Sequence, residues 1–307
     1  MLKKRPIIID TDPGIDDALA IAIALFSGEL DVRLITTVAG NVSIEKVTRN
    51  ALRLLSFFGK DVPVAMGARK PLIGPLVDAS DIHGVSGMEG FDFPEPREDL
   101  LLQENAVNAM RRVIMASEEP ITLVPIGPLT NVALLLSVYP EVSEHIREIV
   151  MMGGSVTRGN KGVMSEFNIA TDPEAAKIVF DSGIPIVVAT LDVGLKALVM
   201  PEDTQKLPDL GQVGQMAHCL FRKYRGGSFN TGLKMYDSCA IAYLLAPTLF
   251  ETVDTFVDVE LAGSLTKGCT VVDLKNYMKQ PANAKVCVDI DGEAFRRWFL
   301  ESVGKCI

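Results

Sequence analysis

The feature that most constrains the fold is a regular alternation, through the first two thirds of the chain, of short apolar runs and amphipathic segments. The apolar runs are rich in β-branched residues and almost continuous in apolar character, which is typical of strands that helices cover on both faces. Strands alternating with helices predict an open, mostly parallel, Rossmann-like α/β sheet. The predicted strands cover residues 7–10, 32–37, 64–66, 121–125, 149–152 and 186–189.

Several segments between these strands carry helix start and stop signals. Ser43 precedes a helical pattern that runs to Phe58, and Gly59 follows it, which is the order expected of a capped helix. Asp172 and Pro173 open another predicted helix, because aspartate suits the cap and proline the first helical position. Further helices are predicted over 105–117, 130–138, 213–224, 237–245 and 292–303, with an antiparallel strand pair near 255–261 and 270–274 and a strand over 285–289.

Length, charge and cysteine usage exclude several classes of protein. The 307 residues can bury a large core, and no linker or repeat divides them, so we expect a single domain over residues 1–307. The net charge of −9 argues against a surface that tracks nucleic acid. No apolar run reaches the length of a membrane span, and the five cysteines are scattered without a C-x-x-C pair. We therefore expect a cytoplasmic protein that binds neither nucleic acid nor membrane.

Four carboxylates follow the first predicted strand within one short segment, residues 10–17. They belong to Asp10, Asp12, Asp16 and Asp17, and Pro13 begins the turn between the two pairs. Helix capping accounts for one or two of them. The others repel one another unless a cation lies among them or some stay protonated. Oxygen ligands alone select a hard cation, so the segment predicts a Ca²⁺ or Mg²⁺ site.

A second interpretation of this segment is a phosphatase. An apolar strand ending in Asp-x-Asp is similar to the nucleophile loop of the haloacid dehalogenase-type phosphatases. Those proteins also need a later Gly-Asp-type acidic motif, and this chain contains no Gly-Asp dipeptide. The short motif is a weak signal without its context, so the phosphatase remains the less favoured alternative.

Polar side chains also follow the later strands, at the edge of the sheet where the acids lie. Asn41, Asn160, Glu166 and Asn168 offer fixed acceptors together with amide donors, a set that suits the hydroxyl groups of a sugar or polyol. Asp237 precedes an apolar helical stretch, and the sequence leaves open whether it caps that helix or binds a metal.

Taken together, these motifs resemble the inosine-uridine nucleoside hydrolase family over nearly the whole chain. The segment Asp-Thr-Asp-Pro-Gly-Ile-Asp-Asp at residues 10–17 matches the signature of that family, and residues 36–41, 83–87, 127–131, 151–154 and 166–168 support the match. Among its subtypes, the chain looks most like the bacterial non-specific ribonucleoside hydrolases. The resemblance implies the nucleoside hydrolase fold and Ca²⁺-dependent cleavage of purine or pyrimidine ribonucleosides to ribose and free base. It also implies a role in nucleoside salvage or catabolism and a homotetramer or homodimer.

The resemblance also implies a role for individual residues. Asp12 would be the general base, with Asp10 as a supporting acid behind the metal. The implied Ca²⁺ ligands are Asp12, Asp17, Asp237 and the carbonyl of Ile126. The implied ribose-binding residues are Asp16, Asn41, Met152, Asn160, Glu166, Asn168 and Asp237.

One position departs from the family pattern. Many members have a histidine, viewed as the acid that assists the leaving base, immediately before the late aspartate, where this chain has Tyr236. His83 lies in the loop that the family places over the base, so His83 and Tyr236 are the candidates for this role. Arg222, Tyr224 and Phe229 are candidates to border the base. A sensor that binds a nucleoside or sugar without cleaving it remains a further alternative.

Overall fold

The computed structural model describes residues 3–228 and 230–307. Within these residues the central sheet has eight strands in the order β10-β13-β6-β5-β4-β1-β2-β3. Every neighbouring pair is parallel except β10 with β13. The strands of this sheet are β1 (Arg5–Thr11), β2 (Leu30–Thr37), β3 (Val64–Met66), β4 (Ile121–Pro125), β5 (Ile146–Met152), β6 (Ile186–Ala189), β10 (Phe250–Thr255) and β13 (Ala284–Ile290).

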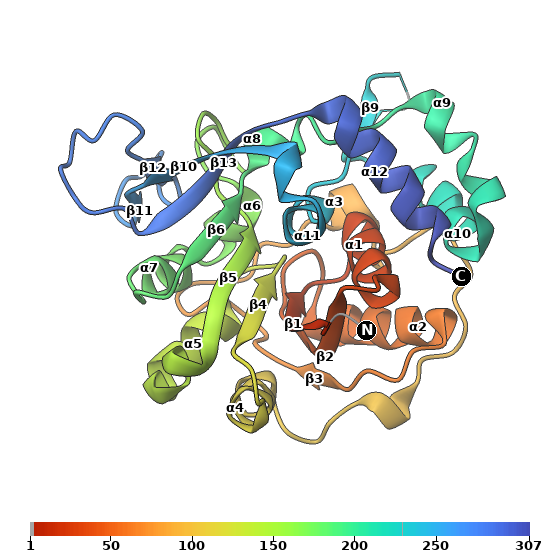
Figure 1. The fold of residues 1–307 in the computed structure, drawn as a ribbon, viewed down its shortest axis with the longest axis horizontal. Helices are drawn as coiled ribbons and strands as arrows, with labels where there is room; N and C mark the ends of the chain where they lie inside the picture. The colour runs from red at the N-terminus through yellow and green to blue at the C-terminus, as the bar shows by residue number, and fades with distance from the viewer. Residues whose placement is uncertain (1–2, 229) are drawn as a thin grey trace.

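Helices cover both faces of the sheet (Figure 1). One face packs against α1 (Ile15–Phe26), α2 (Ile44–Phe58), α10 (Gly211–Phe221), α11 (Ser238–Leu245) and α12 (Gly292–Gly304). The other face packs against α4 (Ala106–Ala116), α5 (Thr130–Val138) and α7 (Pro173–Phe180). Side chains of β1 alternate between the two cores, Ile7 and Ile9 entering one and Ile8 the other, as the period of a strand requires.

Shorter elements complete the chain. The short helices are α3 (Ser80–His83), α6 (Phe167–Thr171), α8 (Leu191–Gly194) and α9 (Pro201–Thr204), and the 3₁₀ turns are η1 (Glu98–Leu100), η2 (Pro140–His145), η3 (Leu207–Leu210) and η4 (Pro247–Leu249). A small antiparallel sheet has the order β7-β9-β8, and β11 pairs with β12. These strands are β7 (Leu198–Val199), β8 (Gly227–Ser228), β9 (Gly232–Lys234), β11 (Val257–Val259) and β12 (Thr270–Val272). None of the helices in the described residues has the length and apolar character needed to cross a bilayer.

The predicted open parallel α/β sheet is confirmed, as are the six predicted strands of its parallel part. Gly59 ends α2 in the left-handed region at φ 61°, and the Asp172 side chain accepts the Ala175 amide at 3.1 Å, as the capping signals predicted. Ser43 occupies the cap of α2, although its side chain makes no capping hydrogen bond. The sequence analysis missed β10, because this half-exposed edge strand lacks the continuous apolar run of the central strands.

Candidate active site

The acidic segment forms a turn between β1 and α1 at the carboxyl edge of the sheet. Asp17 braces this turn: its Oδ1 accepts the Thr11 hydroxyl at 2.7 Å, and its Oδ2 accepts the Gly14 amide at 2.9 Å. The Asn41 side chain, which follows β2, donates to the same Oδ2 at 3.2 Å. These donors hold the carboxylate in one orientation and favour its ionised form, but burial outweighs them and raises the pKa of Asp17 above its ordinary value.

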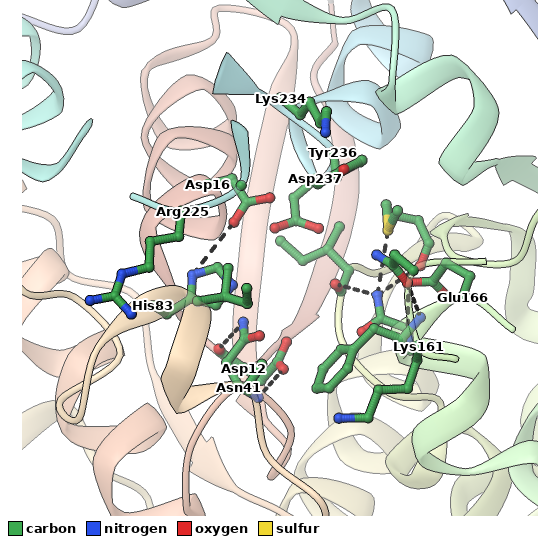
Figure 2. A pocket seen from close by; sticks show the side chains of 18 of the residues that line it. Asp12, Asp16, Asn41, His83, Lys161, Glu166, Arg225, Lys234, Tyr236 and Asp237 are labelled. Atoms are coloured by element: carbon green, nitrogen blue, oxygen red, sulfur yellow. Dashed lines mark hydrogen bonds and ion pairs between the residues drawn. The ribbon is translucent and has the colours of Figure 1, made fainter. Parts of the chain in front are cut away.

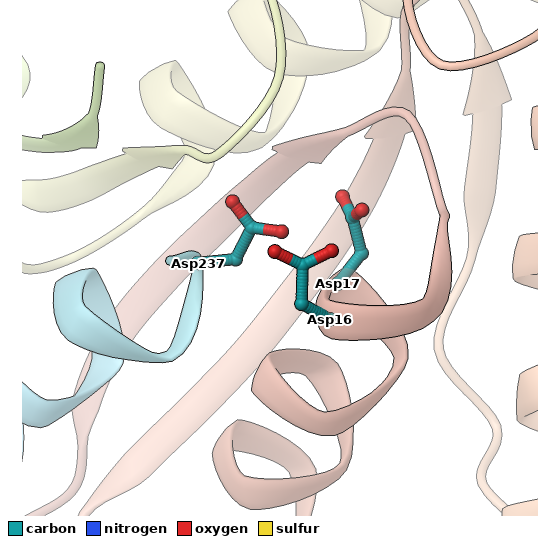
Figure 3. Close-up of side chains that lie close together, drawn as sticks. All are labelled: Asp16, Asp17 and Asp237. Carbon is teal, nitrogen blue, oxygen red and sulfur yellow. The ribbon is translucent and has the colours of Figure 1, made fainter. Parts of the chain in front are cut away.

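Asp237 joins this turn from the far end of the chain. One carboxylate oxygen from each of Asp16, Asp17 and Asp237 lies within 4.8 Å of the others (Figure 3). Asp237 stands at the cap of α11 but makes no capping hydrogen bond there. All three residues are buried. The sequence left open whether Asp237 caps the helix or binds a metal, and its position among the other acids favours a role as a metal ligand.

Burial without compensating positive charge dominates the electrostatics of the cluster. Burial, followed by repulsion from the neighbouring aspartates, raises the pKa values of Asp12 and Asp237 well above the ordinary range. The same causes raise the pKa of Asp16 to about 7. Within the described chain no lysine or arginine pairs with these carboxylates, and His83 Nδ1 lies 3.9 Å from Asp16 Oδ1. A divalent cation would supply the missing charge, and the buried all-oxygen donor set fits Ca²⁺.

Asp12 lies at the edge of this cluster. The resemblance named Asp12 as a ligand beside Asp17 and Asp237, whereas in the structure Asp16 completes the tight group. Asp12 Oδ2 accepts the Asn41 backbone amide at 2.7 Å, and the Asn41 side chain donates to the Asp12 carbonyl at 3.0 Å. A Cβ atom at Gly40 or Gly127 would collide with the Asp12 carboxylate. Glycine at these positions therefore allows the carboxylate to sit against the backbone of two loops.

Asp10 lies behind the acidic turn. Its Oδ1 accepts the Thr36 hydroxyl at 2.6 Å and the Asn131 side-chain amide at 2.8 Å. Its Oδ2 is buried without a hydrogen-bond partner in the described structure. Burial raises the pKa of Asp10 to about 7, in spite of the two donors. The role of Asp10 as a supporting acid, which the resemblance implied, stays a prediction.

A second wall of the site comes from the loop after β5 and from α6. Glu166 caps α6, and its carboxylate accepts the backbone amides of Gly154 (2.9 Å), Asn168 (2.9 Å) and Ile169 (3.2 Å). The Glu166 side chain is buried, which raises its pKa to about 7. Asn160 Oδ1 accepts the amide of Phe167 at 2.9 Å, so Asn160 and Glu166 are both fixed by backbone contacts.

Asn168 ties this wall to the acidic side. Its amide donates to the carbonyl of Ile126 at 3.0 Å and to that of Met152 at 3.1 Å. The carbonyl of Ile126, which the resemblance named as a metal ligand, therefore faces the site and already acts as an acceptor. Ile126 and Met152 follow or end β4 and β5, so neighbouring parallel strands bring their carbonyls together.

The two walls enclose a cavity of about 300 Å³ (Figure 2). His83 and Glu166 lie on opposite sides of it, and Asp12 and Asn41 lie together at its floor. Asp10 and Asp17, the implied supporting acid and one of the implied metal ligands, do not line the cavity. The predicted residues that line it are Asp12, Asp16, Asn41, His83, Ile126, Met152, Asn160, Glu166, Asn168, Tyr224, Tyr236 and Asp237.

His83 and Tyr236 differ in what they can offer a leaving group. His83 Nδ1 accepts the Ile15 amide at 3.2 Å, so in the neutral ring the hydrogen resides on Nε2. Burial lowers the pKa of His83 to about 4, which keeps the imidazole neutral at pH 7. Burial also raises the pKa of Tyr236, whose ring packs against Gly194 with no room for a Cβ atom. His83 is therefore a neutral hydrogen-bond donor, and Tyr236 is a poor source of protons.

The sequence analysis missed three basic residues, Lys161, Arg225 and Lys234, that also line the cavity. Their charges carry no spacing signal in the sequence, although Arg225 directly follows Tyr224, a predicted base-side residue that does line it. Arg222 is exposed outside the cavity lining, and Phe229 lies outside the described residues.

This fold and this acidic pocket are those of a nucleoside hydrolase. The family model described as inosine-uridine preferring nucleoside hydrolase matches residues 7–297, and the chain belongs to that family. The resemblance drawn from the sequence is thus confirmed, and the chain is an enzyme of this family rather than a haloacid dehalogenase-type phosphatase.

Individual relatives cover nearly the whole chain. The non-specific ribonucleoside hydrolase RihC of Klebsiella pneumoniae is 56% identical over 300 residues, which is 98% of each chain. RihC of Salmonella typhi is 55% identical over 295 residues, 96% of each chain. Among solved structures, the purine-preferring ribonucleoside hydrolase from Gardnerella vaginalis superimposes with a TM-score of 0.91 at 30% identity, over 98% of this chain and 99% of that one.

Proposed function

We propose that this enzyme hydrolyses the N-glycosidic bond of purine and pyrimidine ribonucleosides with the help of a bound Ca²⁺, giving ribose and a free base. The observation that carries the proposal is the buried cluster of Asp16, Asp17 and Asp237, which faces the amide and carboxylate wall of Asn168 and Glu166 across one cavity. Family membership and 56% identity to a non-specific ribonucleoside hydrolase support the same activity.

The residues that would hold the cation are Asp12, Asp17, Asp237 and the carbonyl of Ile126, with Asp16 close to them. Their oxygens are the ligands that Ca²⁺ prefers, and the raised pKa values of the buried carboxylates reflect a site short of positive charge. When bound, Ca²⁺ would lower the pKa of a water molecule and fix the 2′ and 3′ hydroxyls of ribose.

The side chains of the site then have separate roles in hydrolysis. Asp12 accepts a proton from water as the water oxygen bonds to C1′ of the ribose. The bond from C1′ to the base nitrogen breaks, and its electron pair leaves with the base. Positive charge develops on the ribose in the transition state, and the carboxylates around the sugar stabilise it. Asn160 and Glu166 bind the 5′ hydroxyl, while Asp16, Asn41 and Asn168 orient the 2′ and 3′ hydroxyls.

His83 assists the leaving base as a neutral donor. Its Nε2–H is free to bond the base, because Nδ1 is occupied by the Ile15 amide. A hydrogen bond of this kind stabilises negative charge on the departing base, whose ring nitrogen then takes its proton from water. Tyr236 also lines the cavity, and its raised pKa makes hydrogen bonding its only contribution.

The cellular context extends the proposal. An enzyme of this specificity would serve nucleoside salvage or catabolism, with ribose and base as products. The scattered cysteines are unpaired in the structure, in agreement with a cytoplasmic location. A homotetramer or homodimer remains the expected assembly.

The deciding experiment is a panel of purine and pyrimidine ribonucleosides assayed for base release after treatment with EDTA and again after addition of Ca²⁺. We expect activity on both classes that EDTA abolishes and Ca²⁺ restores. Full activity of the metal-free protein would contradict the role of Ca²⁺. Tight binding of nucleosides without base release would identify a sensor instead.

A further inference from the structure

Asn50 connects two segments of the site, although it lies outside the cavity. It sits on α2 and is 4% exposed. Its side-chain amide donates one hydrogen to the Pro13 carbonyl at 3.0 Å and the other to the Ser86 carbonyl at 2.9 Å. Pro13 belongs to the acidic turn, and Ser86 to the loop that carries His83. A single buried side chain therefore bonds both segments.

The two segments also contact each other directly. The Ile15 amide of the turn donates to His83 Nδ1 at 3.2 Å. Gly87, in the left-handed region at φ 86°, packs so closely that a Cβ atom there would lie 3.0 Å from Asn50 Nδ2 and 3.3 Å from the Pro13 carbonyl. The loop and the turn thus approach each other closely at position 87, where the positive φ and the short distances both favour glycine.

We propose that Asn50 is a positioning residue, which fixes the imidazole of His83 relative to the carboxylates of the acidic turn. This inference rests on the proposed function, because it assigns to Asn50 the alignment of His83, which assists the leaving base, with Asp12, which accepts a proton from water. The reason is geometric: without the two donated bonds, the loop of residues 84–87 keeps only the exposed bond from Lys46 of α2 to the Val85 carbonyl (2.8 Å), and the His83 ring can move away from Ile15. A displacement of about 1 Å at reacting groups lowers a rate by roughly a hundredfold.

A purely structural role for Asn50 is the alternative to be excluded. Asn283 offers a matched control, since its side-chain amide also bridges two backbone carbonyls, those of Phe180 (3.2 Å) and Val257 (2.9 Å). It lies away from the cavity, next to β13. Substituting either residue by leucine keeps most of its volume while it removes both donated bonds. Asn283→Leu also removes the bond that Asn283 Oδ1 accepts from the Val257 amide at 2.8 Å, so it perturbs the local structure at least as much as Asn50→Leu.

The kinetic test compares Asn50→Leu and Asn283→Leu with the wild-type holoenzyme on uridine and inosine. We expect both substitutions to lower Tm. Asn50→Leu should also lower kcat by about tenfold or more, with a small change in KM, whereas Asn283→Leu should leave both constants unchanged. In a His83→Ala background, Asn50→Leu should cost much less than in the wild type, since coupled residues are not additive. An unchanged kcat in Asn50→Leu, or independent effects of the two substitutions, would overturn the proposal.

A second readout does not depend on activity. Hydrogen exchange followed by mass spectrometry should show faster exchange of residues 12–17 and 83–87 together in Asn50→Leu and in Asn50→Ala, and unchanged exchange of these segments in Asn283→Leu. Faster exchange spread evenly over the molecule would mean a structural role only. If the wild type cleaves no nucleoside, the proposed function fails, and the exchange result still decides whether Asn50 couples the two segments.

Discussion

In the metal-free protein, the stability of Asp10→Asn relative to the wild type should be greater at pH 8 than at pH 5. Asp10 is buried, and its Oδ2 has no hydrogen-bond partner in the described structure. Burial raises its pKa from an ordinary 3.8 to about 7. At pH 5 the folded protein therefore keeps a proton on Asp10 that the unfolded chain has lost, and this difference stabilises the fold.

The size of the effect follows from linkage. The stabilising contribution is fully present below the unfolded pKa and disappears as the pH rises through 7. Between pH 5 and pH 8 the free energy of unfolding of the wild type falls by the equivalent of nearly two pKa units, which is about 2.5 kcal/mol. Asparagine keeps the shape and carries no proton to lose, so the stability of Asp10→Asn relative to wild type should rise by this amount across the interval.

Urea denaturation in EDTA measures this difference. Trp298, the single tryptophan of the chain, provides the fluorescence signal. Chelation is needed because a nearby divalent cation favours the ionised carboxylate and lowers its pKa. With Ca²⁺ present the pH dependence of the difference should shrink. A stability difference between wild type and Asp10→Asn that is the same at pH 5 and pH 8 in EDTA would refute the reasoning.

Three further outcomes are expected. Asp17→Asn should lower kcat/KM by about a thousandfold or more and weaken Ca²⁺ binding measured by calorimetry, because the cluster loses one carboxylate. If the variant keeps both Ca²⁺ binding and turnover, Asp17 is not a ligand. Tyr236→Phe should change kcat by less than about threefold, while His83→Ala should lower it about tenfold or more, and the reverse order would make Tyr236 the leaving-group residue. Titration of His83 should not lower the kcat of the holoenzyme between pH 6 and pH 8, because a pKa of about 4 leaves the imidazole neutral over this whole range. A fall in kcat that is present in the wild type and absent in His83→Gln would contradict this.

Local patterns in the sequence were sufficient for most of the fold. The β-branched runs predicted the parallel strands because a strand buried on both faces must be apolar along its whole length. Gly59 and Asp172 marked helix ends because capping depends on neighbouring residues alone. The edge strand β10 escaped this reasoning, since a half-exposed strand is defined by its partner β13 rather than by its own composition.

The chemistry of the site was also readable in part. Four carboxylates in residues 10–17 predicted a cation site, because they repel one another unless a cation lies among them or some stay protonated, and the family resemblance implied a role for each acid. The sequence could not assign Asp237, because capping and metal binding use the same residue type at the same helix end. Only its approach to Asp16 and Asp17, across more than two hundred residues of chain, distinguishes the two interpretations.

The sequence by itself therefore determined the central parallel strands, the side chains that follow them and the gathering of acids after the first strand, because these properties depend on neighbours along the chain. The tertiary structure alone decided which groups meet. It placed the Ile15 amide on His83, which leaves the imidazole a neutral donor, and it set Asn50 between the acidic turn and the His83 loop. Hydrogen bonds and burial depend on distances between segments remote in sequence, and folding alone fixes those distances.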